Sequence, residues 1–138
     1  MKRVEFDGDR CVWCRSCELV CSLYREGACS PMLSRIRIRL NIFDAEVSAF
    51  VCRQCDDALC AKACPAKAIY FDKRVGAYVV DEGRCRGCGL CAKACPYNKE
   101  GNIIFFNNVR RVFVKCDLCH GEPQCVEVCP SGALRVVG

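Results

Sequence analysis

Sixteen of the seventeen cysteines in this 138-residue chain fall into four groups of four, and no other feature restricts its fold as strongly. Each group opens with C-x-x-C and closes with C-x-x-x-C, and in the last three groups a proline follows the closing cysteine. Thiolates at such regular short spacings are typical of metal ligands. The groups are Cys11, Cys14, Cys17 and Cys21; Cys52, Cys55, Cys60 and Cys64; Cys85, Cys88, Cys91 and Cys95; and Cys116, Cys119, Cys125 and Cys129.

The spacing of the third group, from Cys85 to Pro96, indicates which metal centre is bound. It reads C-x2-C-x2-C-x3-C-P without a gap, the run that holds [4Fe-4S] clusters in bacterial ferredoxins. Four such groups predict four [4Fe-4S] clusters and a protein that transfers electrons.

The fourth cysteine of each group is expected to bind a different cluster from the first three. In two-cluster ferredoxins the last cysteine of each run ligates the other cluster. If the middle two groups form one pair and the outer two another, four sites follow, each named here by its first cysteine. These are the Cys11 site (Cys11, Cys14, Cys17, Cys129), the Cys52 site (Cys52, Cys55, Cys60, Cys95), the Cys85 site (Cys85, Cys88, Cys91, Cys64) and the Cys116 site (Cys116, Cys119, Cys125, Cys21).

Other uses of the cysteines fit the spacing less well. Disulfide scaffolds belong to secreted chains, and zinc sites prefer two well-separated C-x-x-C knuckles, although zinc stays the main structural alternative. Cys116-Asp-Leu-Cys119-His120 has the form of a c-type haem attachment motif, but both cysteines are already required by the fourth group. Cys29 stands outside all four groups and is interpreted as a free thiol.

The positive formal charge does not indicate nucleic-acid binding. The chain carries +5, whereas four oxidised clusters with their thiolates would add about −8 and leave the loaded protein near about −3. Arg35, Arg37 and Arg39 alternate with apolar residues, which predicts a strand with a solvated arginine face and Ile36, Ile38 and Leu40 turned inward.

The order of short apolar runs predicts an α+β fold of nested, dicluster ferredoxin type, with short hairpins and short helices around four clusters. One hairpin is expected from residues 68–71 and 77–80, and a second from 103–106 and 109–114 about Asn107-Asn108. Short helical turns are expected at 59–63 and 90–94, each ended by the following Cys-Pro.

The outer groups are expected to form a second ferredoxin-like unit. Residues 4–6 should form an edge strand near residues 133–137, so that an outer lobe (1–48 with 114–138) encloses an inserted lobe (49–113) in a single domain (1–138). The first group has Ser22 where the others have proline, so its local structure is expected to differ.

The chain shows neither a signal peptide nor an apolar run of transmembrane length, which predicts a cytoplasmic protein. It also offers no phosphate-binding loop and no nucleophile with an adjacent base, and His120 is its only histidine. The sequence therefore predicts a non-catalytic protein.

The segment from Cys11 to Ile38 carries a family resemblance. Cys-Arg-Ser-Cys-Glu-Leu-Val-Cys-Ser-Leu-Tyr-Arg-Glu-Gly and the later Ser-Pro-Met-Leu-Ser-Arg-Ile-Arg-Ile resemble the small subunits of aldehyde ferredoxin oxidoreductase-type tungsten enzymes. These belong to the four-cluster ferredoxin-like electron-transfer subunits. The resemblance implies docking against a catalytic subunit that bears a tungsten or molybdenum pterin.

Three alternatives stay open at this point. The chain could be a free polyferredoxin that serves several enzymes, or a relay subunit of a carbon monoxide dehydrogenase, hydrogenase or formate dehydrogenase system. A structural zinc protein is the remote third. A dedicated subunit should expose an apolar docking surface and co-purify with its partner, whereas a carrier should be monomeric and strongly charged.

Overall fold

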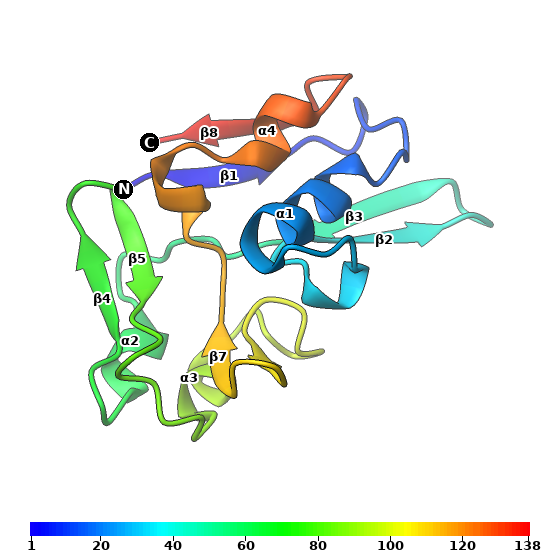
Figure 1. Ribbon diagram of the computed structural model, residues 1–138. Helices are drawn as coiled ribbons and strands as arrows, with labels where there is room; N and C mark the ends of the chain where they lie inside the picture. The colour runs from blue at the N-terminus through cyan, green and yellow to red at the C-terminus, as the bar shows by residue number, and fades with distance from the viewer.

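The computed structural model describes residues 1–138, which form four two-stranded antiparallel sheets and four α-helices (Figure 1). None of the helices is long and apolar enough to cross a membrane. Two short 3-10 helices lie at Pro31–Leu33 and Leu118–Gly121. The strands and α-helices are β1 (Arg3–Phe6), α1 (Ser16–Glu26), β2 (Arg37–Asn41), β3 (Glu46–Phe50), α2 (Leu59–Ala63), β4 (Ile69–Asp72), β5 (Ala77–Val80), α3 (Leu90–Ala94), β6 (Phe105–Asn107), β7 (Val112–Val114), α4 (Gln124–Val128) and β8 (Leu134–Val137).

The two ends of the chain form one sheet. β1 pairs with β8 from Arg3 opposite Val137 to Phe6 opposite Leu134, and the termini lie side by side in Figure 1. Helices α1 and α4 pack against each other beneath this sheet. The predicted pairing of the N-terminal strand with the C-terminal segment is confirmed.

The middle of the chain repeats one unit, a strand pair beside a short helix. β4 pairs with β5 from Ile69 opposite Val80 to Asp72 opposite Ala77, and α2 and α3 pack against each other. Both helices have the predicted bounds. The α+β architecture of short hairpins and short helices is confirmed, whereas the division into two lobes stays a prediction.

The second predicted hairpin forms, but its turn lies later in the chain than expected. Asn107 is the last residue of β6, and its side-chain oxygen accepts hydrogen bonds from the amides of Val109 and Arg110. The left-handed residue of the turn is Arg111, with φ of 60°. Ile103 and Ile104 are not in a strand, because both amides donate to the side chain of Asn98 at 2.9 Å.

The arginine stripe is only partly on the surface, which corrects one prediction. β2 begins at Arg37, and Arg35, before it, is 4% exposed rather than solvated. Three carboxylates surround its guanidinium group and offset the cost of burying the charge. Ile36 and Ile38 are buried as expected.

The first cysteine group differs from the others, as expected from its missing proline. Helix α1 has 11 residues, whereas α2, α3 and α4 have five each. Ser22 continues the helix and is completely buried; its hydroxyl donates to the Glu18 carbonyl and accepts from the Ser30 amide. The segment after Cys21 is thereby fixed against the helix.

The hydrophobic core joins the middle of the chain to its ends. One cluster of ten buried residues contains Val4 and Leu134 of the terminal sheet together with Ala77 and Val79 of β5. The amide of Lys2 also donates to the carbonyl of Gly76 at 2.9 Å. The β4–β5 hairpin therefore packs on the terminal sheet and is not a separate body.

Candidate iron–sulfur sites

Two cavities are each lined by four cysteines drawn from two groups. Cys129 of the last group lies with three cysteines of the first around one cavity, which is also lined by Phe6 and Ile38. Cys95 of the third group lies with three cysteines of the second around the other cavity, here called the inner cysteine cavity, which is also lined by Tyr78 and Ile104. The two sets are Cys11, Cys14, Cys17, Cys129 and Cys52, Cys55, Cys60, Cys95.

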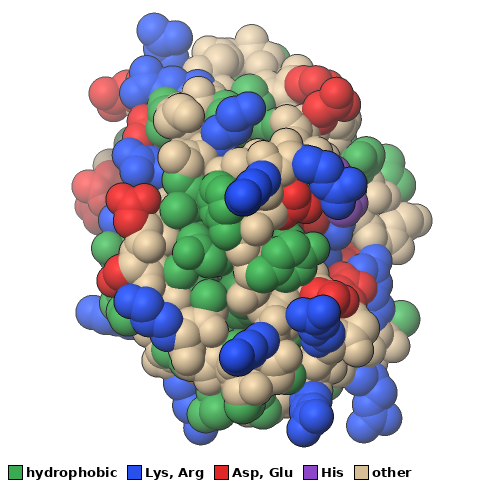
Figure 2. Space-filling view, turned by 90° about the vertical axis from the view of Figure 1, so that its left-hand side faces the viewer, with side chains coloured by type: hydrophobic (Ala, Val, Ile, Leu, Met, Phe, Trp, Pro, Cys, Tyr) green, Lys and Arg blue, Asp and Glu red, His purple; other side chains and the backbone are tan.

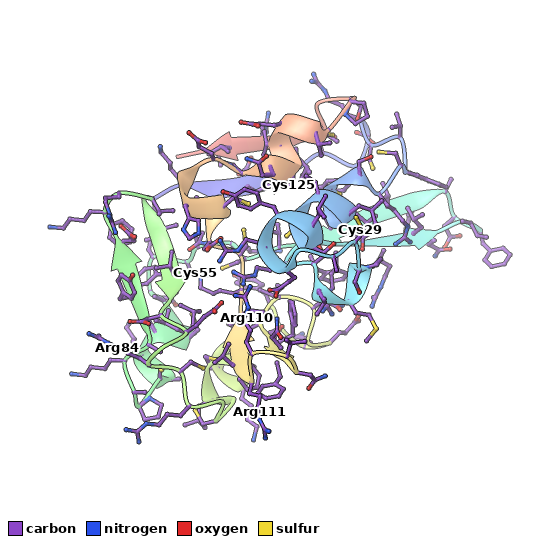
Figure 3. All side chains as sticks on the ribbon, viewed as in Figure 1. Cys29, Cys55, Arg84, Arg110, Arg111 and Cys125 are labelled. Atoms are coloured by element: carbon purple, nitrogen blue, oxygen red, sulfur yellow. The ribbon has the colours of Figure 1, made fainter.

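The remaining cysteines lie beside one another in the corresponding way. The pKa of Cys91 is raised to about 11, mainly by burial and in part by the nearby thiols of Cys60, Cys85 and Cys64. Burial also raises the pKa of Cys125, the cysteine labelled on α4 in Figure 3, and its neighbours Cys116, Cys21 and Cys119 add to the effect. Each of these thiols thus has neighbours from a group other than its own.

Helices α1, α2 and α3, which carry cysteines of the first three groups, begin in the same way. The residue before the helix is left-handed in each case: Arg15 before α1, Ala58 before α2 and Gly89 before α3, with φ of 59°, 41° and 79°. Glycine adopts this conformation without steric cost. In the first two groups, the cysteine before the helix and the first cysteine inside it line the same cavity.

Backbone amides point at the cysteine sulfurs. Donors lie 3.2 to 3.4 Å from the sulfurs of Cys11, Cys21, Cys52, Cys64 and Cys85, which belong to groups one to three. Hydrogen bonds to sulfur stabilise the negative charge of a cluster and influence its reduction potential. The amides are therefore arranged to receive anionic sulfur.

Burial makes several of the cysteines hard to ionise without a bound cation. Burial raises the pKa of Cys17 and of Cys116 to about 12, so that both would be protonated near neutral pH without metal. A coordinating metal deprotonates its thiols. Four thiols line each of two cavities. This donor set fits a cluster of several iron atoms.

The cysteines differ in their exposure. Cys14 and Cys88 are exposed, whereas Cys21, Cys91, Cys119 and Cys125 are buried. Cys29 is also exposed and lies after the end of α1, away from Cys55 and Cys125 in Figure 3. It lines neither cysteine cavity.

An arginine–carboxylate network of six residues crosses the middle of the molecule, where Figure 3 labels Arg110. Arg35 lies 3.5 to 3.7 Å from each of three carboxylates, and the other two arginines make closer ion pairs of 2.6 to 3.1 Å. His120 is exposed, and its ring contacts Arg25 at 2.6 Å. The network consists of Arg25, Arg35, Arg110, Glu26, Glu82 and Asp117.

Lys115 was not identified from the sequence, yet it is 1% exposed and lines the inner cysteine cavity. The one sequence feature that could have indicated its burial is its position directly after the apolar strand β7 and before Cys116. A charged residue at the end of an apolar strand is usually solvated, so that signal alone does not indicate burial.

The chain matches the model of the 4Fe-4S dicluster domain family over residues 43–138. It is 41% identical over 132 residues to the polyferredoxin-like subunit of aliphatic sulfonate oxidoreductase from Pyrococcus furiosus, covering 94% of this chain and 73% of that protein. It is 37% identical to the putative electron transport protein YsaA of Escherichia coli, covering 94% and 85% of the two proteins. A subunit of the anaerobic dimethyl sulfoxide reductase of Escherichia coli is 34% identical, with 93% and 69% covered.

Among solved structures, the fold resembles a component of the active-site complex BamBC of benzoyl coenzyme A reductase bound to benzoyl-CoA. The two align with a TM-score of 0.56 and 24% identity over 99% of this chain and 79% of the other. At this identity the match concerns the fold, and it extends over nearly the whole chain.

Proposed function

This chain belongs to the 4Fe-4S dicluster domain family and is an iron–sulfur electron-transfer subunit of an oxidoreductase complex, and we propose that it relays electrons through four [4Fe-4S] clusters. The clusters occupy the four crossed sites: Cys11, Cys14, Cys17, Cys129; Cys52, Cys55, Cys60, Cys95; Cys85, Cys88, Cys91, Cys64; and Cys116, Cys119, Cys125, Cys21. Bound clusters supply one-electron redox chemistry. The chain holds, insulates and spaces them.

The observation that carries this proposal is the crossed lining of the two cysteine cavities. Neither cavity is lined by one complete group, since Cys129 and Cys95 come from the partner groups. A mononuclear structural site built from one C-x-x-C pair plus another would not require this exchange. Crossed ligation holds two clusters close together, which suits electron transfer between them.

The neighbouring thiols of different sites indicate an order for the relay. Cys60 of the Cys52 site lies near Cys91 of the Cys85 site, Cys52 lies near Cys116, and Cys17 of the Cys11 site lies near Cys125. The order is therefore Cys85 site, Cys52 site, Cys116 site, Cys11 site. The two end sites are those with the exposed cysteines, Cys88 and Cys14, where electrons can enter and leave.

The partner is proposed to be a catalytic subunit that bears a tungsten or molybdenum pterin, of the aldehyde oxidoreductase type. The resemblance of residues 11–38 supports this choice, and the related sulfonate oxidoreductase and dimethyl sulfoxide reductase proteins are themselves parts of oxidoreductases. Figure 2 shows hydrophobic side chains gathered in the middle of the β4–β5 face with lysine and arginine around them. Tyr70 and Phe71 of β4 are both exposed. Such an apolar surface fits a dedicated subunit better than a freely diffusing carrier.

Anaerobic purification of the chain from its native host, followed by metal analysis, tests the proposal. We expect a stoichiometric larger subunit containing tungsten or molybdenum, and about 16 iron atoms per copy of this chain. A stable, iron-loaded monomer without a partner would instead indicate a free carrier. Zinc in place of iron would refute the proposed function altogether.

A further inference from the structure

Lys115 is the largest side chain that is fully buried, and none of the hydrogen-bond partners of its ammonium group is a carboxylate. Its ammonium nitrogen Nζ donates to the carbonyl oxygens of Tyr78 and Cys116 and lies 3.4 Å from Oε1 of Gln54. The fourth neighbour is the sulfur of Cys52, at 3.6 Å. The partners are thus three neutral oxygens and one cluster-ligating sulfur.

A buried ammonium group without a negative partner is costly, because the interior solvates charge poorly. The oxygens satisfy its hydrogen bonds but do not neutralise it. The nearest source of negative charge is the Cys52 site, since a cluster with its four thiolates carries about two negative charges when oxidised and about three when reduced. The ammonium therefore stabilises the reduced form more than the oxidised form.

Neighbouring residues hold the ammonium in place. The Gln54 side chain donates to the Cys116 carbonyl at 3.0 Å and accepts from the Tyr78 amide at 3.0 Å, while the backbone amide of Gln54 lies 3.4 Å from the Cys52 sulfur. The carbonyl of Lys115 accepts from the Arg35 guanidinium at 3.1 Å. Both ends of this lysine are fixed, so that its Nζ stays beside the sulfur.

We propose that the ammonium group of Lys115 raises the reduction potential of the cluster in the Cys52 site. The inference rests on the proposed function. It deepens that function by assigning what controls the electron step between the Cys52 and Cys116 sites. In that step one site loses one electron and the other gains it, and no proton moves.

The test compares reduction potentials in the isolated, cluster-loaded full chain by EPR-monitored titration with dithionite as the electron donor. In Lys115→Met, which keeps the length of the side chain and removes its charge and N–H donors, one of the four components should become at least tenfold harder to reduce. For a one-electron couple this equals about 59 mV. Lys115→Gln, which keeps an N–H donor, should give a smaller shift in the same direction.

The matched control is Lys62→Met. Lys62 lies between Cys60 and Cys64 in sequence but is exposed, so that solvent screens its charge and no component should shift comparably. Equal potentials in wild type, Lys115→Met and Lys62→Met would overturn the inference. Equal shifts in both methionine variants would also overturn it, because net charge alone would then explain them.

A measurement on the wild-type chain covers the case in which the Lys115 variants do not retain iron. Lysine labelled with 15N at the ε position should give a hyperfine coupling to a reduced cluster in pulsed EPR, because one ammonium group lies against a ligand sulfur. Absence of any coupling would overturn the inference while leaving the electron-transfer function intact. A wild-type chain that holds no clusters would refute the proposed function itself.

Discussion

Replacement of Arg35 by methionine should destabilise the loaded protein more than the same replacement of the surface residue Arg39. Its guanidinium group is 5% exposed and lies 3.5 to 3.7 Å from Glu26, Glu82 and Asp117, of which Glu26 and Asp117 are themselves 6% and 9% exposed. Removal of one partner of a buried ion pair typically costs about 3–5 kcal/mol, because the remaining charge is left without compensation.

The structure places the expected cost near the lower end of that range. The arginine–carboxylate network has three cations and three anions, and Arg25 and Arg110 remain paired to its carboxylates at 2.6 to 3.1 Å after the change. The Arg35 contacts are longer than these, and the variant leaves one uncompensated negative charge. We therefore expect a loss of about 3 kcal/mol, or about 10 °C in melting temperature for a chain of this size.

The assay is anaerobic thermal unfolding followed by circular dichroism and by cluster absorbance, at one scan rate because unfolding of a cluster protein is irreversible. Arg39→Met is the matched control, since Arg39 pairs with Glu100 on the surface and such pairs contribute about 1 kcal/mol or less. The double variant Arg35→Met with Asp117→Asn restores the charge balance and should recover part of the loss. If Arg35→Met melts within about 2 °C of Arg39→Met, the network does not stabilise the fold as argued.

Three further outcomes are expected. Cys95→Ser should alter the EPR signal of the Cys52 site while the other three sites keep theirs. Loss of the signal of the Cys85 site in this variant would contradict crossed ligation. The control variant Cys29→Ser should leave all the iron in place. Complete removal of iron should abolish cooperative thermal unfolding measured by circular dichroism, because metal binding supplies folding free energy, and a sharp native-like transition in the apo-protein would contradict this. Gly89→Ala should destabilise the protein more than Gly27→Ala, as measured by chemical denaturation at matched iron content. Both glycines have a positive φ, of 79° and 75°. However, a Cβ at Gly89 would lie 3.1 Å from the Phe113 ring, whereas a Cβ at Gly27 would have no neighbour within 4 Å. Equal losses would show that the contact with Phe113 is unimportant.

Local patterns in the sequence were sufficient to predict the short elements of the fold. Helices α2 and α3 end where Cys-Pro follows, and the β4–β5 hairpin follows from two β-prone runs around a turn-forming segment. Each depends on residues that are close together in the chain. The pairing of β1 with β8 was predictable because both outer cysteine groups open with C-x-x-C and close with C-x-x-x-C, which suggested that they form one unit.

Features that depend on distant residues were not predictable. Arg35 and Arg39 look alike in an alternating stripe, yet Arg35 is buried because Glu82 and Asp117 reach it from segments far along the chain. Lys115 is likewise buried by oxygens of Tyr78 and Gln54, which no local pattern connects to it. The second hairpin was misplaced because Asn107 begins the turn with its side chain rather than occupying the turn with its backbone.

The pairing of β1 with β8 has a consequence for synthesis on the ribosome. β1, at residues 3–6, has its partner at residues 134–137, so the sheet that they form must wait until residues 134–137 have been synthesised. The β4–β5 hairpin and helices α2 and α3, by contrast, are complete once residue 94 has emerged. At typical rates of about 5–20 residues per second, several seconds pass between the synthesis of β1 and that of its partner β8. The proposed Cys11 site therefore cannot be completed before residue 129 has been synthesised, because Cys129 lies with Cys11, Cys14 and Cys17 around one cavity.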